Sequence, residues 1–171
     1  MAQADSGSMK AVINSTPLIA LSMLNHLFVL QALFDEIFVP SSVYKEVVLK
    51  GRNRPGSQEV GKADWIIVKE PAESFPLPPE LLGLDTGEMD VILLAREVKA
   101  DWVLIDEKLA RRVAKGVGLK VKGTLGLLLI ACRIGLVSRE EARTAARELA
   151  SGSFRISDRL LQWFKDQLEP R

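Results

Sequence analysis

The fold is decided by the stretch V-I-N-S-T-P-L-I (residues 12–19), in which a short apolar strand passes directly into a helix. Residues 10–13 predict the strand, and residues 14–17 predict the turn that starts the helix. Pro17 suits a first helical position, because the N–H that proline lacks would have no partner there. The alternation of strand and helix continues along the chain, which indicates a largely parallel sheet and an α/β fold.

Further strands are predicted from apolar runs at 36–39, 65–68, 101–105 and 119–122. Helical spacing of apolar residues predicts two short helices over 17–30 and single helices at 41–48, 85–98, 107–115, 124–134, 138–149 and 157–168. Residues 50–62 indicate a loop or a frayed helix, and the proline-rich residues 71–79 an extended connection. The helix at 138–149 opens with the capping box S-R-E-E.

Length and composition indicate one compact domain, which we place at residues 9–169; residues 1–8 are small and polar and look like an added leader or a disordered tail. The net charge of +1 gives no overall basic field, so any nucleic-acid contact must come from a local patch. The single cysteine, Cys132, fits a core position in a reducing compartment. No run approaches the roughly 18 apolar residues of a membrane span, so we expect a cytoplasmic protein.

Carboxylates and one side-chain amide fall where strands end or helices begin. They are Asn14, Glu46, the run L-D-T-G-E-M-D (84–90) and the pair Asp106–Glu107. An open α/β sheet binds its ligands at the carboxyl ends of its strands. Acidic groups gathered there repel one another unless a cation lies between them, and all-oxygen ligands suit Mg²⁺ or Mn²⁺. This pattern is typical of a metal-dependent phosphodiester hydrolase.

Each of these positions also has a purely structural interpretation. Asp85 and Glu88 form a D-x-x-E capping box, although Glu88 shares the apolar face of its helix and so points inward. Asp106 and Glu107 suit a helix start, and Glu46 alone would be an ordinary surface residue. These alternatives stay open at the level of sequence.

Taken in order, five motifs resemble the PIN-domain family, in particular its VapC-like branch. They are S-T-P-L-I-A-L (15–21), L-D-T-G-E (84–88), L-I-D-E-K-L-A-R-R-V-A (104–114), G-T-L-G-L-L-L (123–129) and F-R-I-S-D-R-L-L (154–161). The resemblance covers residues 9–168. It implies a central parallel sheet between layers of helices, and cleavage of RNA by an endoribonuclease that depends on Mg²⁺ or Mn²⁺.

The resemblance also implies a set of metal-binding and catalytic residues. The first ligand falls on Asn14, the second on Glu46, the third on Glu88, the fourth on Glu107 or the adjacent Asp106, with Asp90 as an accessory acid. Asn14 departs from the family pattern, which has an aspartate there, and it removes one negative charge from the cluster. An amide oxygen can still coordinate a hard cation.

Several side chains near these acids are candidates for binding substrate. Ser15 and Thr16 could orient a ligand or a phosphate, with turn capping as the alternative. Arg111, Arg112 and Lys115 are candidate RNA contacts, with a solvated charged face as the alternative. The resemblance implies a small antitoxin protein as partner and a homodimer. A catalytically weak domain that binds RNA or a protein is the second hypothesis, and a small-molecule phosphatase or nucleotide-binding module with the same carboxylates is a third. The sequence contains no glycine-rich phosphate loop, which disfavours nucleotide binding.

Overall fold

A computed structural model describes residues 7–72 and 79–170 of the chain. Its centre is a five-stranded sheet with the strand order β3-β2-β1-β4-β5. The strands are β1 (Lys10–Ile13), β2 (Glu36–Pro40), β3 (Ile66–Lys69), β4 (Trp102–Leu104) and β5 (Val121–Lys122). All four strand pairings are parallel, so all five strands end at the same edge of the sheet. The predicted α/β class is confirmed.

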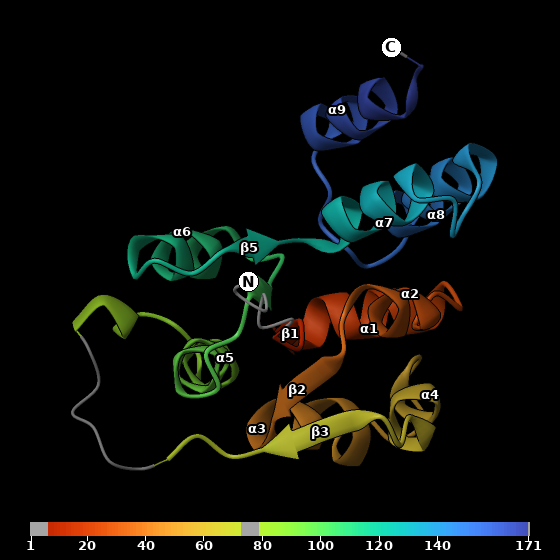
Figure 1. Ribbon diagram of the computed structural model, residues 1–171. Helices are drawn as coiled ribbons and strands as arrows, with labels where there is room; N and C mark the ends of the chain where they lie inside the picture. Colours follow the sequence, from red (N-terminus) through yellow and green to blue (C-terminus); the bar gives the residue numbers. More distant parts are fainter. Residues whose placement is uncertain (1–6, 73–78, 171) are drawn as a thin grey trace, which may run out of the picture.

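Helices lie on both faces of this sheet, as Figure 1 shows. They are α1 (Ser15–Met23), α2 (Phe28–Leu33), α3 (Ser41–Tyr44), the π-helical segment η1 (Lys45–Leu49), α4 (Ser57–Lys62), the 3₁₀ turn η2 (Pro79–Leu81), α5 (Thr86–Glu97), α6 (Lys108–Gly116), α7 (Thr124–Arg133), α8 (Arg139–Ser151) and α9 (Asp158–Leu168). In Figure 1, α5 and α6 lie on one side of the sheet, and α1, α2 and α7 lie on the other. The result is the expected α/β/α sandwich.

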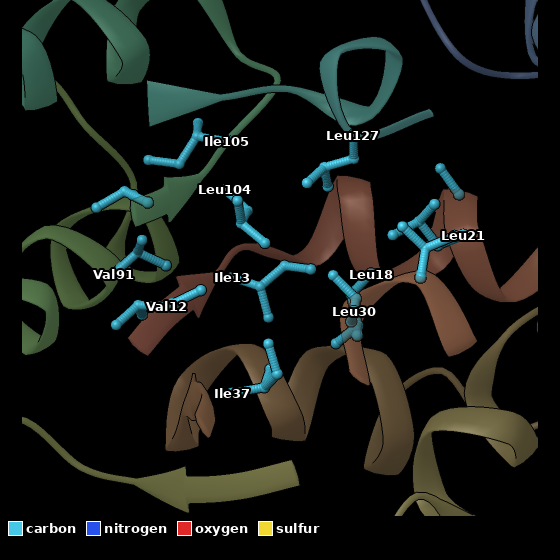
Figure 2. Close-up of a cluster of buried hydrophobic side chains, with 14 of the residues drawn as sticks. Val12, Ile13, Leu18, Leu21, Leu30, Ile37, Val91, Leu104, Ile105 and Leu127 are labelled. Carbon is cyan, nitrogen blue, oxygen red and sulfur yellow. The ribbon is translucent and has the colours of Figure 1, made fainter. Parts of the chain in front are cut away.

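The core fills the space between these layers. Figure 2 shows Ile13 of β1 facing Leu18 and Leu30 on the α1–α2 side, and Val12 facing Val91 of α5 on the other side. Alternate residues of a strand point to opposite faces, so a central strand buried on both sides must be apolar throughout. This requirement explains the unbroken apolar run before Asn14.

The helix boundaries follow local chemistry closely. The chain turns between α1 and α2 at Asn25, which has a φ of 57°, and the expected split of this region is confirmed. The capping box between Ser138 and Glu141 is present at the start of α8. Pro17 is the third residue of α1 rather than the first, because Asn14 is the N-cap. The first and the third residue of a helix both lie in its first turn, where a backbone N–H has no helical partner, so proline is tolerated at either.

Two other expectations need a comment. Cys132 is half-buried and packs against the core. It is therefore less enclosed than the core position that we expected. The connection predicted at 71–79 lies largely outside the described residues. No helix in the described ranges is both long and apolar enough to cross a membrane.

Candidate active site at the carboxyl end of the sheet

The two central strands bring Asn14 close to the pair Asp106–Glu107. β1 and β4 are parallel neighbours with Ile13 opposite Leu104, and the Asn14 N–H donates to the Leu104 carbonyl at 2.9 Å. Asn14 and the acidic pair therefore leave the sheet side by side at its carboxyl edge, where open α/β sheets bind ligands.

Asn14 and Thr16 both hydrogen-bond to Glu107. The Asn14 side-chain nitrogen donates to Glu107 Oε2 at 3.3 Å, and the Thr16 hydroxyl donates to Glu107 Oε1 at 2.5 Å. Asn14 is only 3 % exposed, whereas Glu107 is half-buried. The neutral amide thus supplies a donor to a carboxylate that an aspartate at this position would repel. It leaves its own oxygen available on the other side.

Glu46 reaches the same region from η1. Glu46 is exposed, yet desolvation by the surrounding protein raises its pKa above the ordinary value, and the negative charges of Asp85 and Glu107 raise it further. The Lys50 ammonium and the Ser15 side chain offset part of this rise. Carboxylates from three separate elements therefore repel one another here.

Glu88 belongs to a complete capping box at the start of α5. The Asp85 N–H donates to Glu88 Oε2 at 3.0 Å, and the Glu88 N–H donates to Asp85 Oδ1 at 2.8 Å, so the capping interpretation is confirmed. Burial is the largest cause that raises the pKa of Glu88, and the charges of Asp85 and Glu107 add to it. Glu88 therefore folds back onto its own helix and still lies within the field of Glu107.

Asp106 has a different environment from Glu107. Its Oδ1 accepts from the Thr124 N–H at 2.7 Å, and its Oδ2 accepts from the Thr124 hydroxyl at 2.6 Å. Burial raises the pKa of Asp106, and these two bonds only partly offset the rise. Because Gly123, the N-cap residue of α7, has no side chain, Asp106 caps that helix from another part of the chain.

Close packing surrounds this contact. A Cβ at Gly123 would lie 2.7 Å from both Arg111 Nη1 and Asp106 Oδ1, so only glycine fits there. The Arg111 guanidinium donates to the Ile105 carbonyl at 3.1 Å. Asp106 thus links the end of β4 to α7, and Arg111 links α6 to the end of β4.

The remaining predicted residues lie around this centre. Asp90 of α5 accepts from the Ser42 hydroxyl at 2.5 Å, and Arg112 is exposed on α6. Ser15 adjoins Glu46, as described above. The structure therefore brings together Asn14, Glu46, Glu88 and Glu107, with Asp85 added. Asp106 and Asp90 instead accept hydrogen bonds from Thr124 and Ser42.

The donor chemistry of this centre fits a hard divalent cation. All its potential ligands are oxygens, and the negative charges of Asp85 and Glu107 add to the rise that desolvation causes in the pKa values of Glu46 and Glu88. Gly87 leaves room beside it, because a Cβ at that position would contact Asp85 Oδ1 at 3.5 Å and Asn14 Oδ1 at 3.8 Å. Within residues 7–72 and 79–170, however, no three His, Cys, Asp or Glu side chains lie close enough to hold one ion in this arrangement.

Comparison with known proteins identifies the class. A family model described as a PIN domain matches residues 10–170, so the chain belongs to the PIN-domain family. No curated protein matches the sequence. Members of this family are typically nucleases and generally use divalent metal ions.

Sequence reasoning did not identify Thr124 as a partner of Asp106. The available signal was the dipeptide Gly123–Thr124 directly after a strand, since a glycine with a hydroxyl residue often marks a helix start. That signal does not say which carboxylate, 18 positions earlier, accepts the hydrogen bonds.

Proposed function

We propose that this chain is a metal-dependent endoribonuclease, in which Asn14, Glu46, Glu88 and Glu107 hold Mg²⁺ or Mn²⁺. One observation carries the proposal. Glu46 and Glu88 come from different elements, and both have raised pKa values to which the charge of Glu107 contributes. Such crowding is unfavourable unless a cation offsets it.

Each residue of the candidate site has a separate role in the proposed reaction. A divalent ion held by these residues would lower the pKa of a bound water and offset negative charge on the phosphate. Asn14 and Thr16 orient Glu107 through their hydrogen bonds, and Glu46 faces the same space from η1. Asp106 positions Glu107 by fixing the turn between β4 and α6 against α7. We assign the fourth ligand to Glu107, because it is hydrogen-bonded to Asn14 and its charge acts on both Glu46 and Glu88, whereas Asp106 caps α7 through Thr124.

The test compares two capping-box glutamates. Glu88→Gln removes a charge at the site, and Glu141→Gln makes the same change in the capping box of α8. Labelled single-stranded RNA is incubated with each protein, with Mn²⁺ and with EDTA. We expect Mn²⁺-dependent cleavage by the wild type and Glu141→Gln, and none by Glu88→Gln. Equal cleavage by both variants, or cleavage in EDTA, would refute the proposal.

A second candidate is a catalytically weak PIN domain that binds RNA or a partner protein. It is favoured by the hydrogen bond from Asn14 to Glu107, which relieves charge at the centre without any metal ion. In that case Mn²⁺ would neither bind at the centre nor promote cleavage, and RNA binding would persist in EDTA.

The cellular role that we propose is the toxin of a toxin–antitoxin pair in the cytoplasm, inhibited by a small antitoxin protein. We further propose a homodimer. Support comes from α9, where Phe164 is fully buried but Leu160 and Trp163 are each 43 % exposed. A terminal helix with large apolar side chains on its outer face suits a symmetric contact.

A further inference from the structure

Two lysines converge on one tryptophan at the edge of the sheet. The Lys122 ammonium lies 4.3 Å from the centroid of the Trp102 ring, and the Lys120 ammonium lies 5.6 Å from it. Trp102 begins β4, and Lys122 ends β5, the last strand on that side. Trp102 and Lys122 are half-buried, whereas Lys120 is exposed.

The ring attracts two like charges to the same side chain. A cation over an indole face gains about 0.5–1 kcal/mol at an exposed site, which favours one position for each flexible lysine. Two ammonium groups at one ring also repel each other. Within the described part of the chain, neither lysine forms a salt bridge that would offset this repulsion. An anion placed between them would do so.

The surrounding segment is strongly basic although the whole chain is nearly neutral. Residues 108–122 contain six basic residues and no acidic one: Lys108, Arg111, Arg112, Lys115, Lys120 and Lys122. Three of them, on α6, are exposed: Lys108, Arg112 and Lys115. Helix α6 contacts β5, and Figure 1 shows the two side by side. The positive charge is therefore concentrated in this segment, at one edge of the sheet, rather than spread over the whole chain.

We propose that Lys120, Lys122 and Trp102 form a binding site for the phosphate backbone of single-stranded nucleic acid. The two ammonium groups bind phosphate oxygens, and the indole holds them in position and offers a face next to the adjoining base. Basic side chains beside an aromatic ring are the combination that binds single strands without reading their sequence. An acidic polypeptide lacks the bases that would use the ring.

The position of this site relates it to the acidic centre. Lys122 is two residues before Thr124, which bonds to Asp106, and two residues of chain span roughly 7 Å at most. A nucleic-acid strand bound by Lys122 therefore has a short path towards Glu107, whereas Trp102 lies at the far end of β4. This link rests on the proposed nuclease function, whereas the phosphate site itself does not.

The test measures binding apart from cleavage. Fluorescence anisotropy follows a short labelled oligouridylate over a series of salt concentrations in EDTA. Lys120→Gln/Lys122→Gln is compared with wild type and with Lys62→Gln/Lys165→Gln, which removes two exposed charges from α4 and α9. Each phosphate contact on a single strand contributes about 0.7 to the slope of log affinity against log salt. The site variant should therefore lose about 1.4 from that slope, and bind roughly 10- to 30-fold more weakly at about 0.1 M salt.

The tryptophan is tested separately. Trp102→Phe keeps an aromatic face and should retain most of the binding, whereas Trp102→Leu should weaken it with the salt slope unchanged. A site variant that matches the control in affinity and slope would overturn the proposal, and so would full binding by Trp102→Leu. Salt-dependent binding of polyglutamate but not of the oligonucleotide would also overturn it and assign the patch to an acidic protein.

The same proteins separate this proposal from the nuclease proposal. A reduced salt slope in the site variant, with no cleavage by the wild type in Mn²⁺, would support the binding site and refute the nuclease. Mn²⁺-dependent cleavage with an unchanged salt slope would refute the binding site and support the nuclease.

Discussion

Replacement of Asn14 by aspartate tests the candidate centre most directly. Asn14 is 3 % exposed, and its side-chain nitrogen donates to Glu107 Oε2 at 3.3 Å. In Asn14→Asp a carboxylate oxygen takes the place of that donor. An attractive contact thus becomes a contact between two negative charges, in a place where the carboxylates of Glu46 and Glu88 are already crowded.

The size of the effect follows from this geometry. Loss of a hydrogen bond to a charged acceptor costs about 1.5–3 kcal/mol. Two unit charges at the 3.3 Å of the present contact repel by roughly 5 kcal/mol at an effective dielectric constant of about 20. That repulsion is an upper limit, because the side chains can separate or one can take up a proton. We expect metal-free Asn14→Asp to lose about 2–4 kcal/mol of unfolding free energy, or roughly 5–15 °C in melting temperature.

A bound cation should reverse this loss, because it turns the added charge into an added ligand. The assay is thermal unfolding in EDTA and in a Mn²⁺ series, for wild type, Asn14→Asp and the control Asn25→Asp, which adds the same charge at an exposed turn. Asn14→Asp should melt lowest in EDTA and gain most from Mn²⁺, at about 2.7 kcal/mol for a metal concentration of 100 times Kd. An equal Mn²⁺ gain in all three proteins would refute metal binding at Asn14.

The layout of the fold could be predicted from the sequence because its signals are local. An apolar run ending at Asn14 predicts a buried strand, and the pairs Asp85–Glu88 and Ser138–Glu141 predict helix starts that the structure contains. Such signals depend on residues a few positions apart. The π-helical turn that carries Glu46 was not predicted, because the sequence there has ordinary helical spacing.

The centre itself depends on strand register, which local patterns do not contain. Glu107 lies near Asn14 because β1 and β4 are neighbours, although 93 positions separate the two residues. The different partners of the acidic pair were likewise not predictable: Asp106 accepts from Thr124, whereas Glu107 accepts from Asn14 and Thr16. The structure also shows that capping and proximity to Glu107 are compatible for Glu88, which sequence reasoning had set against each other.

Three further changes test the remaining assignments. Asp106→Ala should lower the free energy of unfolding in urea by about 2–4 kcal/mol, because two buried groups of Thr124 lose their acceptor. Asp106→Asn should lower it by less than about 1 kcal/mol. Equal losses in the two variants would refute the capping role. If α9 forms the dimer contact, light scattering should show a dimer for the wild type and a monomer for Leu160→Glu/Trp163→Glu. A wild type that remains monomeric at high concentration would refute the proposed homodimer. The last test concerns Glu88, whose pKa is raised in the folded state chiefly by burial. Its favourable contribution is complete below the unfolded pKa, near 4.5, and is lost as pH rises through the folded pKa. In EDTA, Glu88→Gln should therefore match the wild type at low pH and exceed it at neutral pH, by no more than about 1 kcal/mol because solvent screens a half-exposed group. Glutamine keeps a side-chain oxygen that can accept from the Asp85 N–H, so loss of the capping box does not obscure the comparison. A wild type that gains stability over Glu88→Gln as pH rises, without metal, would contradict the raised pKa of Glu88 and remove the support that the proposed metal site draws from it.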